Sequence, residues 1–260
     1  MMNTSRIIAV ANQKGGVGKT TTSVNLATAL AACGRRVLLI DFDPQGNAST
    51  GLGIGVSDRK FNSYRLLTGQ DSAAAAVQRS NVPSLDIIAA IVDLSAAEVE
   101  LTDIDRREFC LKDAIEVSNF SYDYIIVDCP PSLGLLTVNA LCAADSVLVP
   151  LQCEFYALEG LSQLLKTIDM VKLKLNPKLH IQGILLTMYD SRNRLSDQVA
   201  NDVRVHFGSV VYDTVIPRNV RVSEAPSFGQ PVLMYDLNCA GARAYVELAA
   251  ELLNQERDAA

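Results

Sequence analysis

Continuous apolar runs alternate with amphipathic stretches along the sequence, and this alternation predicts the order of secondary structure. Runs that are apolar at nearly every position are typical of parallel strands buried on both faces, whereas apolar residues three or four positions apart indicate helices. The segments that read as strands are residues 7–11, 36–41, 85–90, 124–128, 146–152, 181–187 and 210–216. Helical stretches lie between them, so we expect an α/β fold with a mostly parallel, twisted sheet and helices on both faces.

Two of the predicted helices carry an apolar stripe on one face, and we expect both stripes to pack in the core. They consist of Leu158, Leu161, Leu165, Ile168 and Leu175 in one helix and of Tyr245, Leu248, Ala249, Leu252 and Leu253 in the last one. The first of these helices should end at the Asn-Pro pair of residues 176–177, because proline interrupts a helix. Shorter helices are expected at residues 71–78 and 108–117.

Length and composition bound the domain organisation and the class of protein. The chain has 260 residues, 49% of them hydrophobic, which suits one large core, so we expect a single domain over residues 1–260. No apolar run is long enough to span a bilayer and no signal peptide precedes the first strand, so a cytoplasmic protein is expected. The net charge of −6 argues against a surface coated in nucleic-acid-binding charge, and any DNA affinity must come from a local patch.

The cysteine pattern argues against a zinc or iron–sulfur site within one chain. The six cysteines form no C-x-x-C pair, and only His180 and His206 are available to complete such a site. Most of the cysteines stand in apolar surroundings, so we expect them to be reduced core residues.

Residues 14–21, with the sequence KGGVGKTT, are the strongest candidate for a phosphate-binding loop. They follow the first apolar run and open a helical pattern that ends near Gly34. Glycines let backbone N–H groups turn inward around an anion, and the helix N-terminus adds partial positive charge. In such a loop Lys19 reaches the β and γ phosphates of ATP and the Thr20 hydroxyl lies on Mg²⁺. The predicted ATP-binding residues of the loop are Lys14, Gly15, Gly16, Val17, Gly18, Lys19, Thr20 and Thr21.

Carboxylates follow two of the predicted strands, at the edge where doubly wound sheets bind ligands. Asp41 and Asp43 belong to the sequence DFDPQGN, in which Pro and Gly fix a turn. Asp128 ends the strand at residues 124–128. An apolar strand that ends in Asp is the Walker B pattern, in which the carboxylate holds Mg²⁺ directly or through water.

These linked motifs resemble those of the ParA/MinD family of ATPases, which carry a deviant Walker A loop, KGGxGKT. The usual phosphate-loop pattern has a glycine where this chain has Gln13, and Lys14 stands instead at the start of the loop. The resemblance implies that Lys14 reaches across a nucleotide-sandwich homodimer to the partner's ATP. It further implies that Asp43 orients or activates the attacking water and that Asp41 supports the Mg²⁺ shell.

The second half of the chain is similar to the ParA/Soj branch in particular. The segments that carry this similarity are residues 154–160, which lie at the nucleotide and dimer interface in that branch, 188–194 and 217–226. By this resemblance Pro217 and Asn219 touch the adenine. Arg192 and Arg221 are expected to contact DNA phosphates, with a plain solvated surface as the alternative.

The resemblance covers residues 7–253 and implies a protein of chromosome or plasmid partitioning. ATP would close the homodimer, the dimer would bind double-stranded DNA of any sequence on the nucleoid, and hydrolysis stimulated by a ParB-type partner would release it. A MinD-like ATPase recruited to the membrane is disfavoured, because the last helix has no lysine and carries Glu247, Glu251 and Glu256. A metal-cluster assembly ATPase of the same fold is disfavoured by the cysteine spacing.

Three departures from the family bear on the expected contacts. Residues 89–91 read Ala-Ala-Ile where relatives often carry Pro-Ala-Asn, and Asn238 and Ala240 stand where relatives often carry Lys or Arg. The segment of residues 190–221 contains five arginines and four aspartates. One subunit therefore offers only a thin basic patch, and we expect modest DNA affinity that needs both subunits.

Overall fold

The computed structural model describes residues 5–154 and 157–258, and an eight-stranded sheet runs through them. The strands are β1 (Arg6–Val10), β2 (Val37–Asp41), β3 (Val77–Arg79), β4 (Leu85–Ile88), β5 (Tyr124–Asp128), β6 (Ser146–Gln152), β7 (His180–Tyr189) and β8 (Val211–Pro217). Their order in space is β3-β4-β2-β5-β1-β6-β7-β8. Every neighbouring pair is parallel except β3 with β4, so the sheet is mostly parallel, as predicted.

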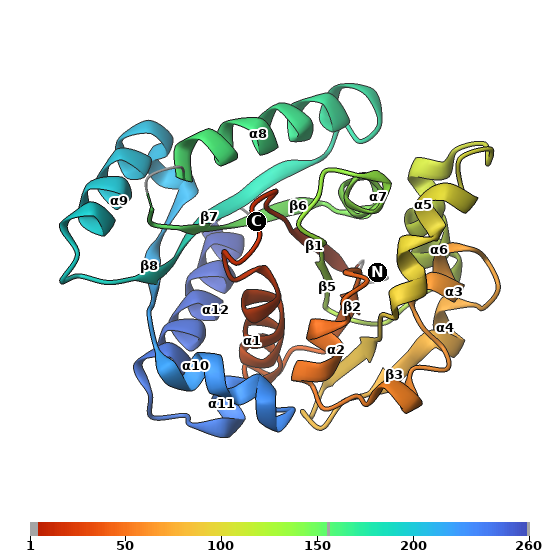
Figure 1. Cartoon of the computed structure of the whole chain (residues 1–260), viewed down its shortest axis with the longest axis horizontal. Helices are drawn as coiled ribbons and strands as arrows, with labels where there is room; N and C mark the ends of the chain where they lie inside the picture. Colours follow the sequence, from red (N-terminus) through yellow and green to blue (C-terminus); the bar gives the residue numbers. More distant parts are fainter. Residues whose placement is uncertain (1–4, 155–156, 259–260) are drawn as a thin grey trace.

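Helices cover both faces of this sheet (Figure 1). The α-helices are α1 (Lys19–Ala32), α2 (Asn47–Gly51), α3 (Ser63–Leu67), α4 (Ala73–Ala76), α5 (Ala97–Glu100), α6 (Cys110–Ser118), α7 (Leu135–Ala143), α8 (Ala157–Lys174), α9 (Arg194–Phe207), α10 (Val220–Glu224), α11 (Val232–Tyr235) and α12 (Ala240–Asp258). Short 3-10 helices span Val56–Asp58, Val92–Ser95, Arg107–Phe109, Gly208–Val210 and Ala225–Phe228. Helices α1 and α12 lie side by side on one face, and α7 and α8 lie on the other.

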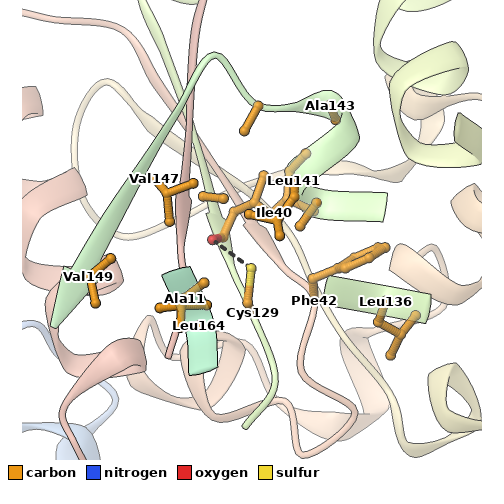
Figure 2. Packing of buried hydrophobic residues seen from close by; sticks show 14 of the residues in the cluster. Ala11, Ile40, Phe42, Cys129, Leu136, Leu141, Ala143, Val147, Val149 and Leu164 are labelled. Carbon is orange, nitrogen blue, oxygen red and sulfur yellow. Dashed lines mark hydrogen bonds between the residues drawn. The ribbon is translucent and has the colours of Figure 1, made fainter. Parts of the chain in front are cut away.

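One part of the core lies between the sheet and helices α6, α7 and α8. Ile40, Val147 and Val149 of the strands pack there with Leu136 and Leu164 of the helices (Figure 2). Strands β2 and β5 are buried at every position, which explains why their sequences are apolar up to the final aspartate.

The other part of the core lies under α1 and α12. Tyr245, Leu248 and Leu252 of α12 are buried there, so the apolar face predicted for the last helix packs against α1 and β8. The stripe predicted for α8 is confirmed as well, because Leu161 and Ile168 are buried on the opposite side of the sheet.

The prediction of a helix over residues 71–78 is wrong in its second half. Helix α4 ends at Ala76, and Val77–Arg79 form the edge strand β3, which pairs antiparallel with β4. The alanine-rich segment favours a helix locally, but hydrogen bonds to β4 take over once the chain reaches the sheet. The predicted strand at residues 85–90 ends earlier than expected, at Ile88.

The sheet brings the candidate residues to one edge. Strands β1, β2 and β5 are neighbours and parallel, and their carboxyl ends are in register, with Val10 and Asp41 both opposite Asp128. The segments that follow these strands therefore meet at the place where α/β sheets bind ligands.

Candidate functional site

The loop between β1 and α1 forms the centre of the site. Gly16 and Gly18 have φ angles of 75° and 88°, in the left-handed region where a side chain would be strained. The Thr187 hydroxyl of β7 donates a hydrogen bond to the Val17 carbonyl at 2.8 Å. Met188, beside Gly18, has a positive φ of 49°, so the end of β7 is distorted where it meets the loop.

Lys19, the first residue of α1, is almost fully buried behind this loop. Its Nζ donates to the Lys14 carbonyl at 3.0 Å. Burial lowers the pKa of Lys19, while the nearby carboxylates of Asp128 and Asp43 raise it. A buried cation that has only a carbonyl partner can exchange that partner for a phosphate with little further loss of solvation.

Lys14, at the start of the loop, is tied to β6 and to the residues that follow it. Asn12 accepts from the Lys14 N–H at 3.0 Å and donates to the Pro150 carbonyl at 2.7 Å. The Lys14 ammonium forms an ion pair with Glu154 of the same chain. Of the predicted interface segment 154–160, residues 155 and 156 lie outside the described part of the chain.

Asp128, at the end of β5, is fully buried with one oxygen left unpaired. Its Oδ1 accepts from the Ser23 hydroxyl at 2.8 Å, whereas Oδ2 has no hydrogen-bond partner in the described part of the chain. Burial raises the pKa of Asp128, as does the carboxylate of Asp41, and the nearby hydroxyls of Ser23 and Thr20 lower it. An unpaired oxygen of this kind is costly to bury, so it indicates a place for a cation or its water.

Asp41, at the end of β2, is held by the segment that follows it. Its Oδ2 accepts from the backbone N–H of Ser49 at 2.8 Å and from the Ser49 hydroxyl at 2.6 Å. Oδ1 accepts from the Asp43 N–H at 3.3 Å. Burial raises the pKa of Asp41, and the Ser49 hydrogen bonds lower it. Because its oxygens are already bonded, Asp41 suits a supporting position behind the metal better than a direct one.

Asp43 lies on the tight turn that follows β2. The residue is 7% exposed, and its Oδ1 accepts from the Gln45 N–H at 3.0 Å. The Asp43 carbonyl accepts from the Gly46 N–H at 2.9 Å, and Gly46 has a φ of 63°, which only glycine adopts easily. The Asp43 carboxylate lies near enough to Lys19 to raise the pKa of that lysine.

The residues predicted to hold Mg²⁺ fit a hydrated ion that also takes phosphate ligands. In residues 5–154 and 157–258, no group of three or more His, Cys, Asp and Glu side chains could bind a metal on its own. Mg²⁺ usually keeps several waters and takes one or two carboxylates plus substrate phosphates. Thr20, with its hydroxyl near Asp128, and the free oxygen of Asp128 match that mode.

Two serines in this network were not predicted. Ser23 lies four residues after Lys19, on the same face of α1, and Ser49 lies in α2 after the Asp43 turn. The helical spacing from Lys19 was a usable signal for Ser23. No sequence signal pointed to Ser49, because its contact with Asp41 depends on how the turn after β2 folds.

Pro217 and Asn219 lie on the far side of β7 from the loop. Pro217 ends β8 and is in register with Tyr189 of β7. The Asn219 side chain accepts from the Arg221 N–H at 2.9 Å and so caps α10. A cavity of about 290 Å³ next to the start of α1 is lined from this side by Val222 and neighbouring residues, and neither Pro217 nor Asn219 lines it.

The two arginines predicted to contact DNA are exposed but paired with acidic neighbours. Arg192 donates to both oxygens of Asp190 at 2.9 Å, which holds the pKa of Asp190 at about 2. Arg221 donates to Glu224 at 2.9 Å and lies 3.5 Å from a carboxylate oxygen of Asp236. Both arginines follow the carboxyl ends of neighbouring strands, β7 and β8. The predicted patch is therefore largely neutralised within its own chain.

Comparisons with known proteins agree on one group of relatives. A family model described as an AAA domain matches residues 5–181. The chain is 62% identical to the chromosome partitioning protein ParA of Caulobacter vibrioides, over 98% of this chain and 97% of that one. It is 54% identical to the sporulation initiation inhibitor protein Soj of Bacillus subtilis, over 95% and 98% of the two chains. A crystal structure of cobyrinic acid a,c-diamide synthase from Mycobacterium smegmatis, with bound ADP and magnesium, superposes with a TM-score of 0.87 and 39% identity, covering 99% and 97%.

Proposed function

Because this chain belongs to the ParA/Soj family of partition ATPases, we propose that it hydrolyses ATP in the partitioning of a chromosome or a plasmid. Its similarity to proteins named for chromosome partitioning is higher than its similarity to the mycobacterial synthase, at 62% and 39% identity. The proposal therefore follows the partition proteins.

The unpaired, buried Oδ2 of Asp128 beside Lys19 is the observation that carries the nucleotide part of this proposal. Residues 14–21 would cradle the phosphates of ATP, with Lys19 moving from the Lys14 carbonyl to a phosphate. Thr20 and Asp128 would hold Mg²⁺, with Asp41 behind them. The bound ion would supply positive charge against the phosphates.

Hydrolysis in this proposal depends on Asp43 and Lys14. Asp43 would accept a hydrogen bond from the attacking water, and the turn that holds it, in which its Oδ1 accepts from the Gln45 N–H, would orient the carboxylate for that task. Lys14 would act on the ATP of a second subunit in a closed homodimer. Since Lys14 pairs with Glu154 in its own chain, closing the dimer has to exchange that ion pair for phosphate.

The ATP-bound dimer would bind double-stranded DNA through Arg192 and Arg221. Both arginines are exposed, and phosphate contacts of this kind carry no base information, so binding should be independent of sequence. A ParB-type partner would stimulate hydrolysis and release the dimer from the nucleoid.

A membrane-recruited ATPase is the competing function, and the packing of the last helix disfavours it. Among the described residues, no helix is long and apolar enough to cross a bilayer. A helix that binds a membrane surface must present its apolar face, but Tyr245 and Leu248 of α12 are buried against α1 and β8. Glu251 also accepts hydrogen bonds from the Asp213 and Thr214 backbone N–H groups.

One experiment separates these functions. Retention on immobilised DNA of two unrelated sequences is compared with co-sedimentation on anionic liposomes, each with ATP or ADP. We expect ATP-dependent retention on both DNAs and no sedimentation with liposomes. Liposome binding that needs ATP, without DNA retention, would overturn the proposal.

A further inference from the structure

Arg59 is a buried arginine with uncharged hydrogen-bond acceptors. The residue is 6% exposed. Its Nη2 donates to the Thr50 hydroxyl at 2.8 Å and to the Ile54 carbonyl at 2.9 Å, and its Nη1 donates to the Ala90 carbonyl at 3.1 Å. Among the described residues no carboxylate forms an ion pair with Arg59, although Asp41 is near enough to raise the pKa of Arg59 against the effect of burial. A buried charge held in this way is costly, and a neutral side chain could fill the same space. Packing alone therefore does not account for an arginine at this position.

Hydrogen bonds lead from Arg59 to the turn that carries Asp43. Thr50, which accepts from Arg59, donates through its hydroxyl to the Gly46 carbonyl at 3.1 Å. The Gly46 N–H donates in turn to the Asp43 carbonyl at 2.9 Å. A Cβ atom built on Gly46 would overlap the guanidinium of Arg59, so Arg59 also supports the turn by direct packing.

The same turn is fixed from a second direction through Ala90. The Ala90 carbonyl accepts from Arg59, and the Ala90 N–H donates to the Ser49 hydroxyl at 3.0 Å. Ser49 then donates to Asp41. Ala90 thus contacts this network through its backbone groups, which do not depend on the side chains at positions 89 and 91, where the chain departs from the family's Pro-Ala-Asn.

Helix α2, which Arg59 contacts through Thr50, also borders the start of α1. Thr50 and Gly51 line the cavity of about 290 Å³ together with Thr20 and Thr21 of α1.

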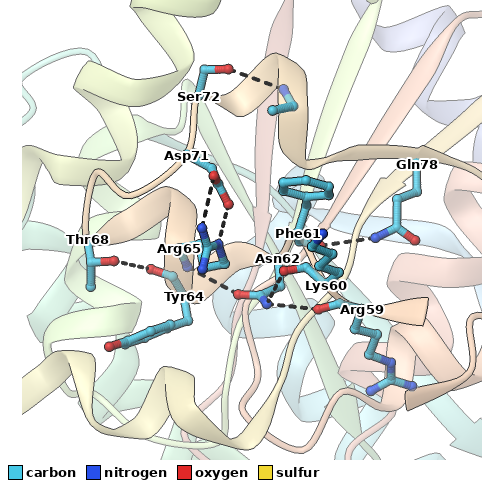
Figure 3. Close-up of polar contacts among 11 residues, drawn as sticks. Arg59, Lys60, Phe61, Asn62, Tyr64, Arg65, Thr68, Asp71, Ser72 and Gln78 are labelled. Carbon is cyan, nitrogen blue, oxygen red and sulfur yellow. Dashed lines mark hydrogen bonds and ion pairs between the residues drawn. The ribbon is translucent and has the colours of Figure 1, made fainter. Parts of the chain in front are cut away.

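Arg65 provides a natural contrast in the same segment. It forms an ion pair with Asp71, and Figure 3 shows the Arg59 guanidinium pointing away from that pair. The Asn62 amide donates to the Arg59 carbonyl at 2.9 Å and accepts from the Arg65 N–H at 3.1 Å, so both arginines belong to one rigid segment. Only Arg59 reaches the turn of Asp43 through the contacts above.

We propose that Arg59 is a positioning residue for hydrolysis, which holds the turn of residues 43–46 so that the Asp43 carboxylate is oriented toward the attacking water. The inference rests on the proposed role of Asp43. Arg59 itself touches no reacting atom.

The test compares full-length Arg59→Gln, Thr50→Val, Asp43→Ala and the double variant Arg59→Gln/Asp43→Ala with wild type. We expect Arg59→Gln to lower kcat for ATP about 10- to 100-fold, because small displacements of a catalytic group are costly, and to leave the affinity for ADP unchanged. Thr50→Val, which replaces the hydroxyl that links Arg59 to Gly46 by a methyl group, should also lower kcat, but by less. This variant keeps the test decisive if Arg59→Gln does not fold.

The double variant separates positioning from general stabilisation. If Arg59 acts through Asp43, adding Arg59→Gln to Asp43→Ala should not reduce kcat further. Arg65→Gln, the matched control, should leave kcat unchanged at a similar melting temperature. Additive losses, or a normal kcat in both Arg59→Gln and Thr50→Val, would refute the inference while the role of Asp43 stands. A normal kcat in Asp43→Ala would instead refute the proposed role of Asp43.

Discussion

Two regions of the molecule satisfy their charges in opposite ways. The nucleotide corner consists of Lys19, Asp41, Asp43 and Asp128, and the arginine surface consists of Arg192 and Arg221. In the nucleotide corner the charged groups are buried, and one oxygen of Asp128 has no partner in the part of the chain that the structure describes. On the arginine surface the side chains of Arg192 and Arg221 are 87% and 53% exposed, yet each is paired with carboxylates of its own chain.

This difference indicates whether each region can bind its ligand within one subunit. A buried group without a partner destabilises the free protein and gains on binding a ligand, so we expect a single chain to bind nucleotide. An exposed arginine that already has a carboxylate partner gains little from a single phosphate. DNA binding should therefore need the summed contacts of two subunits, whereas nucleotide binding should not.

The largest expected effect comes from Lys14, which in the proposed homodimer acts on the ATP of the partner subunit. Lys14→Ala should lower ATP hydrolysis roughly 10³-fold, because arginine fingers that supply charge in trans contribute about 10³–10⁵ in rate. ATP binding by the monomer should persist, and light scattering should show no ATP-dependent dimer. Lys172→Ala removes the same charge from an exposed site on α8 and should change neither quantity. A stable ATP-bound dimer of Lys14→Ala would show that Lys14 is not the closing contact.

The next effect tests whether the nucleotide corner works within one chain. Lys19→Ala should weaken ATP binding about 10- to 100-fold, because hydrogen bonds between charged groups contribute about 1.5–3 kcal/mol. The melting temperature without nucleotide should not fall, since the variant removes a buried ammonium whose pKa burial has lowered. Calorimetric titration with ATP gives the affinity. An unchanged affinity would show that residues 14–21 do not bind the phosphates of ATP as proposed.

Much of the fold could be predicted because its signals are local. Strands β2, β5 and β6 are continuous apolar runs, and the structure places them where the sequence predicts. Strand β3 could not be predicted, since Val77–Arg79 become a strand only by pairing with β4. Its sequence carries no apolar run of its own, and the alanines before it favour a helix.

The candidate site divides in the same way. The carboxylates could be placed from sequence, because strands that end in Asp and lie parallel bring Asp41 and Asp128 together. The contacts of Arg59 with Ala90 and of Asp41 with Ser49 could not, since they depend on how the turn after β2 folds back. The ion pair between Arg221 and Asp236 could not be predicted from the sequence either, because α11 separates the two residues along the chain.

The arginine surface should respond more weakly to any single change than the nucleotide corner does. Arg192→Glu and Arg221→Glu should each weaken ATP-dependent DNA binding about tenfold and reduce the salt slope by about 2, because both subunits of the dimer lose the contact. Dimerisation and basal ATP hydrolysis should remain. The measurement is DNA retention over a range of salt concentrations, on two unrelated sequences, which should be affected equally. Arg106→Glu is the matched control, because Arg106 is also exposed and paired with an aspartate, Asp113. If both variants bind DNA normally, the patch lies elsewhere.

The smallest expected effect tests the comparison of the two regions most directly, because the substitutions change the carboxylates that neutralise Arg221 and leave the arginine in place. Glu224→Gln and Asp236→Asn should each raise the DNA affinity of the ATP-bound dimer about two- to fivefold, since a phosphate no longer has to displace a carboxylate from Arg221. Asp113→Asn makes the same change beside Arg106 and should have no effect. A decrease in affinity would mean that the carboxylates hold Arg221 in its DNA-binding position. In both regions the placement of charged side chains before binding would then matter more than the number of unpaired charges.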